Sequence, residues 1–213
     1  MNYEYIDLTK WERGGLFVYF TEKMRNVISV TADIDVSGLP EACRRRGISF
    51  YAAVMWCAAK AVNGRENFRI GMIEGRPVRY DRVDPYYAHY IESDGKFVKA
   101  VAEYDDELSV FAEHYETNKR LFGERRGPCR EVPPNVFDVS CLPWLHYKSL
   151  DLHVFDDGLY MAPVVTWGKY TGNGASLEMP MTLQIHHAVA DGRHVAAFFE
   201  DAQTNVRGIA EIL

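Results

Sequence analysis

The hydrophobic pattern changes its period near the C-terminal end of the chain. Residues 177–187 alternate as in a β-strand. The two faces of this strand are Leu183, Ile185 and His187, and Thr182, Gln184 and His186. After Asp191-Gly192 the apolar residues follow a helical stripe formed by Val195, Phe198, Phe199, Ala202, Val206, Ile209 and Leu213. We therefore predict a strand, a tight turn and a helix, with His187 at the strand end, where functional side chains are common.

Strand and helix signals also alternate along the rest of the chain, which favours a mixed α/β fold. Expected strands are 26–35, 136–142 and 160–170, the last antiparallel to 177–187, and expected hairpins are 68–83 and 86–104. Expected helices are 37–47, 50–62, 106–122 and 195–209. Because we find no repeat, low-complexity tract or linker, residues 1–213 are predicted to form one domain.

Charge and composition argue against several classes of function. A net charge of −6 disfavours nucleic acid as a partner. No stretch approaches the roughly 20 apolar residues of a membrane span, and the first residues do not resemble a signal peptide. The four cysteines lack metal-ligand or redox spacing, so we expect no metal site. These features predict a cytoplasmic protein.

The segment from His186 to Gly192 permits two interpretations. In the structural one, Asp191 caps the last helix and His187 is a satisfied core histidine, which composition alone favours. In the functional one, His187 is a catalytic base. Metal binding by the histidine pair is disfavoured, because adjacent strand residues point to opposite faces.

Four segments together carry a family resemblance. They are Gln184–Val195, Val139–Trp144, Ala162–Tyr170 and the opening of the chain, where Asn2-Tyr3 and Asp7–Arg13 match. In order and spacing they resemble the trimeric chloramphenicol acetyltransferases. The resemblance implies a two-layer α/β sandwich with a mixed sheet. It also implies an O-acetyltransferase that moves acetyl from acetyl-CoA, used as a co-substrate with no permanently bound cofactor, to a hydroxyl of chloramphenicol or a similar aromatic alcohol.

The resemblance also implies catalytic roles. His187 would be the general base, with its other ring nitrogen held by its own carbonyl, and Asp191 would pair with Arg13 to hold the turn. Ser140 would donate to the oxyanion of the tetrahedral intermediate. A nucleophilic Ser140 is the competing interpretation, although no Gly-flanked elbow surrounds it. Thr166 would bind the intermediate through water.

The acceptor pocket and the coenzyme site follow from the same resemblance. The apolar pocket would be lined by Phe20, Phe97, Phe122, Leu152 and Val164, and Lys169 and Tyr170 would contact the coenzyme. Phe20 stands where the family often has tyrosine, and Asn26 and Ile28 also differ from common pocket residues. Ser49 stands where some members have a lysine near the coenzyme phosphate, a loss for which Arg44 to Arg46 could compensate.

The resemblance further implies a homotrimer with its active sites between subunits. His187 would come from one chain, and Ser140, Phe20, Phe97 and Leu152 from its neighbour. The apolar residues Trp144, Phe155 and Tyr160 would lie at or near these interfaces. Two other functions remain open. One is transfer to a different hydroxyl by an acyltransferase of the same fold, to which the dihydrolipoyl acyltransferase cores are related by the same histidine–Asp-Gly signature. The other is ligand binding without catalysis.

Overall fold

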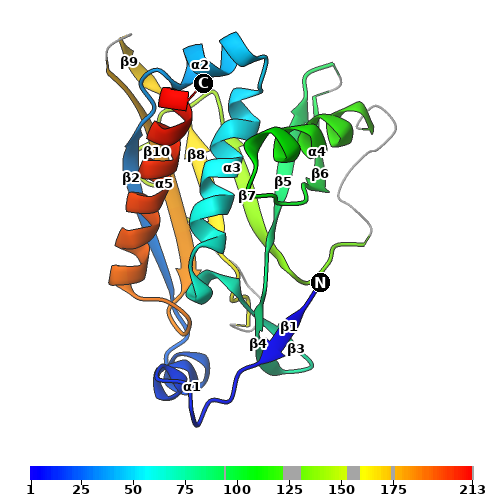
Figure 1. Ribbon diagram of the computed structural model, residues 1–213. Coiled ribbons are helices and arrows are strands. Elements are labelled where there is room, and N and C mark those ends of the chain that lie inside the picture. Colours follow the sequence, from blue (N-terminus) through cyan, green and yellow to red (C-terminus); the bar gives the residue numbers. More distant parts are fainter. Residues whose placement is uncertain (94, 122–130, 153–158, 174–175, 213) are drawn as a thin grey trace.

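Figure 1 shows the computed structural model, which describes residues 1–93, 95–121, 131–152, 159–173 and 176–212. Its centre is a large mixed sheet in the spatial order β2 (Val27–Asp35), β10 (Ser176–His186), β8 (Val164–Gly168), β7 (Val136–Leu142), β5 (Asp84–Ile91) and β6 (Lys96–Val101). The pairs β5·β7 and β7·β8 are parallel, and the other pairs along this path are antiparallel. The short strand β9 (Thr171–Asn173) adds to β10.

Helices α3 (Phe50–Asn63) and α5 (Gly192–Ile212) cover one face of this sheet (Figure 1). Seven consecutive residues of α3, from Ala53 to Ala59, are buried between the sheet and the neighbouring helices, and small alanines allow close packing there. Helices α2 (Leu39–Arg46) and α4 (Leu108–Leu121) flank α3. The two-layer α/β architecture with a mixed sheet is therefore confirmed.

The predicted strand–turn–helix is also present. Strand β10 ends at His186 and α5 begins at Gly192. Along α5 the buried side chains of the predicted stripe are Val195, Phe198, Ala202, Val206 and Ile209. Phe199 is half-buried, and Leu213 lies outside the described residues. Both faces of β10 are buried at its C-terminal end, because Thr182, Gln184 and His186 are covered as well.

The first residues of the chain form elements that the sequence analysis did not predict. Strand β1 (Tyr3–Tyr5) joins β4 (Arg76–Tyr80) and β3 (Ile70–Ile73) in a small antiparallel sheet. Helix α1 (Gly14–Glu22) follows it near the end of β10 that leads into the histidine turn (Figure 1). A 3₁₀ turn, η1 (Glu66–Arg69), connects α3 to β3. Among the described residues, no helix is both long and apolar enough to cross a membrane.

Candidate active site

His187 is held in a defined orientation at the end of β10. Its backbone N–H donates to Asn26 O at 3.0 Å, which extends the β2·β10 ladder by one residue. Its ring Nδ1 lies 2.9 Å from Ala190 O. Because a carbonyl can only accept, Nδ1 carries the proton and Nε2 keeps its lone pair. The arrangement therefore presents Nε2 as a base.

The carbonyl that holds the ring differs from the one expected. The sequence analysis assigned this role to the histidine's own carbonyl, but His187 O accepts from Arg13 Nη2 at 2.7 Å. The turn instead brings Ala190 O to the imidazole. The expected acceptor was wrong, because the turn brings Ala190 O, rather than His187 O, within hydrogen-bond distance of the ring Nδ1. The consequence for the tautomer is the same.

Arg13 ties the whole turn together from a buried position. Its side chain donates to three carbonyls, Ala188 O at 2.9 Å, His187 O at 2.7 Å and Ala190 O at 2.8 Å. Its Nη1 forms an ion pair with Asp191 Oδ2 at 3.0 Å. Arg13 is only 8% exposed. The expected pairing with Asp191 is present, and the guanidinium fork fixes the path of the backbone on either side of the imidazole.

Asp191 has a second partner that sequence reasoning missed. Its Oδ1 lies 2.9 Å from His194 Nδ1 and accepts from the Arg193 backbone N–H at 3.0 Å. Burial acts to raise the pKa of Asp191, but the hydrogen bond and charge of His194, with Arg13 and Arg193, outweigh it and lower that pKa overall. An Asp followed three residues later by His at a helix start is the signal that could have revealed this contact.

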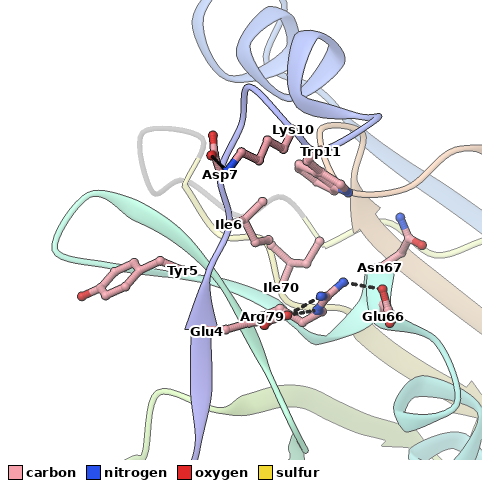
Figure 2. Close-up of a pocket in the computed structure, with 10 residues that line it drawn as sticks. All are labelled: Glu4, Tyr5, Ile6, Asp7, Lys10, Trp11, Glu66, Asn67, Ile70 and Arg79. Carbon is pink, nitrogen blue, oxygen red and sulfur yellow. Dashed lines mark hydrogen bonds and ion pairs between the residues drawn. The ribbon is translucent and has the colours of Figure 1, made fainter.

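The turn also rests on a residue that is distant in the sequence. Asn67 Nδ2, on η1, donates to Val189 O at 2.6 Å. Asn67 lines a cavity of about 280 Å³. Figure 2 shows it with Trp11, Lys10 and an ion-pair network in which Arg79 bridges two glutamates. His187 does not line this cavity. The cavity therefore lies beside the turn, and its charged groups pair with one another.

Phe20 of α1 covers the imidazole of its own chain. The two rings are stacked, with centroids 4.0 Å apart and an interplanar angle of 18°. The sequence analysis placed Phe20 opposite the histidine of an adjacent subunit, and this was wrong for the contact seen here. The physical reason is that α1 follows directly on Arg13, and Arg13 is anchored to the same turn.

Ser140 and Thr166 lie in one row across the sheet but far from this His187. The register pairs Ser140 with Thr166 and Thr166 with Thr182. Thr182 precedes His187 by five residues, which corresponds to about 17 Å along a strand. Thr166 is 1% exposed, and its Oγ1 has no hydrogen-bond partner among the described residues. The structure thus groups Ser140 with Thr166 and separates both from the imidazole of the same chain.

The predicted pocket residues do not form a closed slot within one chain. Val164 is buried, whereas Phe97 is 52% and Leu152 is 45% exposed. Buried Gln184 fixes the backbone of Leu152, since its side chain accepts from Leu152 N at 3.1 Å and donates to Leu152 O at 3.2 Å. Phe122 lies outside the described residues.

Lys169 and Tyr170 lie just beyond β8, at the opposite end of the sheet from α1 (Figure 1). Tyr170 packs edge-on against Phe50, with centroids 5.4 Å apart. The hydroxyl of Ser49 is neutral, and it caps α3 by accepting a hydrogen bond from Ala52 N. The arginines 44–46 are exposed at the end of α2.

Comparison with solved structures identifies the class of fold. A solved chloramphenicol acetyltransferase superposes with a TM-score of 0.84 at 22% identity, over 96% of this chain and 100% of the other. A probable dihydrolipoamide acetyltransferase from Listeria monocytogenes gives a TM-score of 0.65 at 12% identity, over 92% and 90%. The chain therefore has the fold of an acyltransferase.

Comparison of sequences then identifies the family. The sequence model of the family described as chloramphenicol acetyltransferase matches residues 1–203. A chloramphenicol acetyltransferase of Clostridium perfringens is 29% identical over 206 residues, covering 95% of this chain and 94% of the relative. One of Streptomyces acrimycini is 32% identical over 205 residues, covering 93% and 92%. The chain belongs to the chloramphenicol acetyltransferase family, whose members are acetyl-CoA-dependent acyltransferases.

Proposed function

We propose that this enzyme transfers acetyl from acetyl-CoA to a hydroxyl of chloramphenicol or a similar small aromatic alcohol, with His187 as general base. The observation that carries the proposal is the hydrogen bond from Nδ1 to Ala190 O, which leaves Nε2 as the basic atom. An alcohol is almost unionised at neutral pH, so transfer needs a base of the strength of imidazole at the reacting hydroxyl.

In the proposed reaction both substrates are bound together. His187 Nε2 takes the hydroxyl proton while the hydroxyl oxygen attacks the thioester carbonyl carbon, and a tetrahedral oxyanion forms. The carbon–sulfur bond then breaks, the acetyl ester leaves, and the imidazolium returns its proton to the departing thiolate. Phe20, stacked on the ring, excludes water from one face of the imidazole.

Ser140 would stabilise the oxyanion by donating its hydroxyl hydrogen. Thr166, adjacent to it in the sheet, has a buried hydroxyl oxygen with no protein partner among the described residues, which suits the proposed bridging water. Neither role needs a covalent acetyl-serine. Arg13 and Asp191 would act by fixing the turn that carries the base.

We propose that the active site is shared between subunits of a homotrimer. The base and the oxyanion donor must both contact one acetyl group, and a separation of about 17 Å along the strands prevents this within one chain. The exposed apolar surface supports the same assembly, since Trp144 is 60% exposed and packs against Tyr90, which also contacts half-exposed Phe97. Tyr160 is half-buried, and Phe155 lies outside the described residues.

We further propose that Lys169 and Tyr170 bind the coenzyme. Exposed Lys169 and the arginines 44–46 offer positive charge for phosphate at the end of the sheet that carries Tyr170.

We also propose that residues 1–213 act as one domain in the cytoplasm. The thiols of Cys43 and Cys57 are free and buried, as is usual in a reducing compartment.

The test is a thiol-release assay with acetyl-CoA and a panel of alcohols, with chloramphenicol first. We expect thiol release that depends on chloramphenicol, with the acetyl ester identified by mass spectrometry. Release with other alcohols but not with chloramphenicol would assign a different acceptor. Binding of chloramphenicol without any acetyl transfer would contradict the proposal and identify a non-catalytic binding protein.

A further inference from the structure

Three threonines lie side by side on adjacent strands of the large sheet. The register pairs Thr182 of β10 with Thr31 of β2 on one side and with Thr166 of β8 on the other. Both strand pairs are antiparallel, so the opposed side chains project to the same face with Cβ atoms about 5 Å apart. A hydrogen bond between the two hydroxyls is one of the contacts that stabilise such pairs.

The two threonine pairs differ in whether they form that hydrogen bond. Thr182 Oγ1 lies 2.7 Å from Thr31 Oγ1. Thr166 Oγ1, in contrast, is buried and has no hydrogen-bond partner among the described residues. A buried hydroxyl without a partner destabilises the folded state, so this difference between two similar pairs calls for an explanation.

The phenol of Tyr147 accounts for the difference. Its hydroxyl donates to the backbone Thr166 O at 2.7 Å and accepts from Thr182 Oγ1 at 3.1 Å. Because a threonine hydroxyl has only one hydrogen, Thr31 must then supply the hydrogen of its own pair with Thr182. The phenol therefore takes the hydrogen that Thr182 would otherwise donate to Thr166 Oγ1.

Tyr147 is held firmly in this position. It is 7% exposed, and burial raises the pKa of its hydroxyl to about 12, so the phenol remains a neutral donor. Its ring packs against the end of β8, where a Cβ on Gly168 would lie 2.9 Å from Tyr147 Cε1. The preceding loop is tied to the same place by the hydrogen bond from Lys169 N to Leu145 O at 2.9 Å.

The hydroxyl of Thr166 lies where the proposed reaction needs one. Thr166 is in register with Ser140, the proposed oxyanion donor, on the side of β8 away from β10. In the proposed function this hydroxyl binds the water that bridges to the tetrahedral intermediate. A bond to Thr182 would draw it toward β10, away from Ser140, and would occupy it before the reaction.

We propose that Tyr147 is a positioning residue for acetyl transfer, which engages the hydroxyl of Thr182 and so keeps that of Thr166 available to the tetrahedral intermediate through water. This inference rests on the proposed function, in which Thr166 contacts the intermediate in this way. Tyr147 itself contacts neither substrate. It acts by determining which partner Thr166 Oγ1 has.

The experiment removes the phenol hydroxyl and then the competing threonine hydroxyl. With acetyl-CoA and chloramphenicol, or the best acceptor of the alcohol panel, Tyr147→Phe should lower kcat by about 10-fold, the value of one hydrogen bond, and change either KM little. Adding Thr182→Val should restore kcat to within about 3-fold of the native value, because no hydroxyl then competes for Thr166. The Tm of this double variant should stay below that of the native protein, since its buried hydrogen bonds are still missing. A merely structural role would lower both quantities further.

Two further variants serve as controls. In a Thr166→Val background, Tyr147→Phe should have no additional effect on kcat, because the hydroxyl that it keeps available is gone. Tyr104→Phe removes the hydrogen bond of another buried phenol, to Asp106 at 2.7 Å, and should lower the Tm without changing kcat. Should Tyr147→Phe fail to fold, Tyr147→Met with and without Thr182→Val provides the same comparison.

The outcomes separate this inference from the proposed function. Native kcat in Tyr147→Phe, or a double variant with Thr182→Val that remains as slow as Tyr147→Phe alone, would overturn the inference and leave the proposed function standing. Absence of acetyl transfer to every alcohol by the native enzyme would contradict the proposed function itself.

Discussion

Arg13 shows how one side chain can set the conformation of the turn that follows His187. Its three nitrogens reach three backbone carbonyls and one carboxylate, all between His187 and Asp191. A lysine would present a point charge with no planar fork, so it could not satisfy the same acceptors together. We therefore propose that the arginine positions the imidazole rather than binding a reactant.

The first prediction concerns the base and the oxyanion donor. His187→Gln should lower kcat by several orders of magnitude, because no other group is proposed to take the proton. Ser140→Ala should lower it by roughly 10²-fold, as for the loss of one oxyanion donor. Steady-state kinetics with acetyl-CoA and chloramphenicol measure both. Near-native turnover of His187→Gln would rule out the mechanism.

His186→Ala is the matched control for the first prediction. The His186 side chain is on the opposite face of β10, where its Nδ1 accepts from Ala188 N at 3.0 Å. We expect its substitution to lower the Tm while affecting kcat far less than His187→Gln does. A comparable loss of kcat with an unchanged Tm would transfer the catalytic role to this residue.

The second prediction concerns the ion pair beside the turn. Arg13→Gln and Asp191→Asn should each lower the free energy of unfolding and reduce activity in part. In a double-mutant cycle their coupling should exceed the roughly 1 kcal/mol of an exposed pair, because Arg13 is buried. Additive effects would mean that the two side chains do not interact in solution.

The pH dependence of stability provides an independent test of the same pair. The pKa of Asp191 is lowered in the folded state, so the unfolded state binds more protons as the pH falls toward that pKa. The stabilisation by ionised Asp191 is then fully present above the pKa of an unfolded aspartate, about 4. It is lost as the pH falls from that value through the lowered pKa of the folded state. Native and Asp191→Asn proteins should differ most in unfolding free energy at neutral pH and converge in acid. A pH-independent difference would show that the charge is not responsible.

At the scale of elements, the hydrophobic core is concentrated where α5 crosses the sheet. Phe198 is fully buried and contacts Phe68 with ring centroids 6.0 Å apart, edge to face. The third prediction is that Phe198→Ala lowers the free energy of unfolding by about 3–5 kcal/mol, because it leaves a cavity. Exposed Glu200→Ala on the same helix should change it by less than about 0.5 kcal/mol. Denaturant unfolding at one fixed protein concentration measures both.

The elements predicted well are those whose sequence pattern is strong and local. The change of period at Asp191-Gly192 located β10 and α5, and the alternation around Glu74-Gly75 located the β3–β4 hairpin. Strand β1 is only three residues long and exposed, so it carries no comparable pattern. Its pairing with β4 depends on residues more than 70 positions away, which no local period can indicate.

Some features of the candidate site were likewise predicted from the sequence, and others were not. The position of His187 at a strand end and the pairing of Asp191 with Arg13 were predicted, the second through family resemblance. The hydrogen bond from His187 Nδ1 to Ala190 and the support from Asn67 were not. Both depend on how a turn folds back in space, and side-chain types alone do not specify that path.

For the whole molecule, the decisive feature is the separation between His187 and Ser140, the two residues to which we have proposed catalytic roles. Strand β2 lies at the edge of the sheet with β10 on one side, and Asn26, the residue before it, faces His187. The region of Ser140 and the exposed side chains of Phe97 and Leu152 lie elsewhere on the same chain. A closed ring of identical chains could bring the two regions together at every interface.

The fourth prediction tests this assembly. Inactive His187→Ala and Ser140→Ala chains, unfolded and reassembled together, should recover part of the native activity, because hybrid trimers contain some sites with both residues intact. Each variant reassembled alone is the control. Sedimentation should give the mass of a trimer. A fully active monomer, or no recovery despite demonstrated exchange of subunits, would refute the shared site.

Arg13 and Asp191 are 178 residues apart in the chain, and this distance has a consequence for synthesis. The guanidinium emerges from the ribosome long before the carbonyls that it will bind. At typical rates of roughly 5–20 residues per second, it waits on the order of ten seconds or more for them. A nascent chain can therefore pair β5, β6, β7 and β8 before the guanidinium meets any of the carbonyls that it binds in the folded protein.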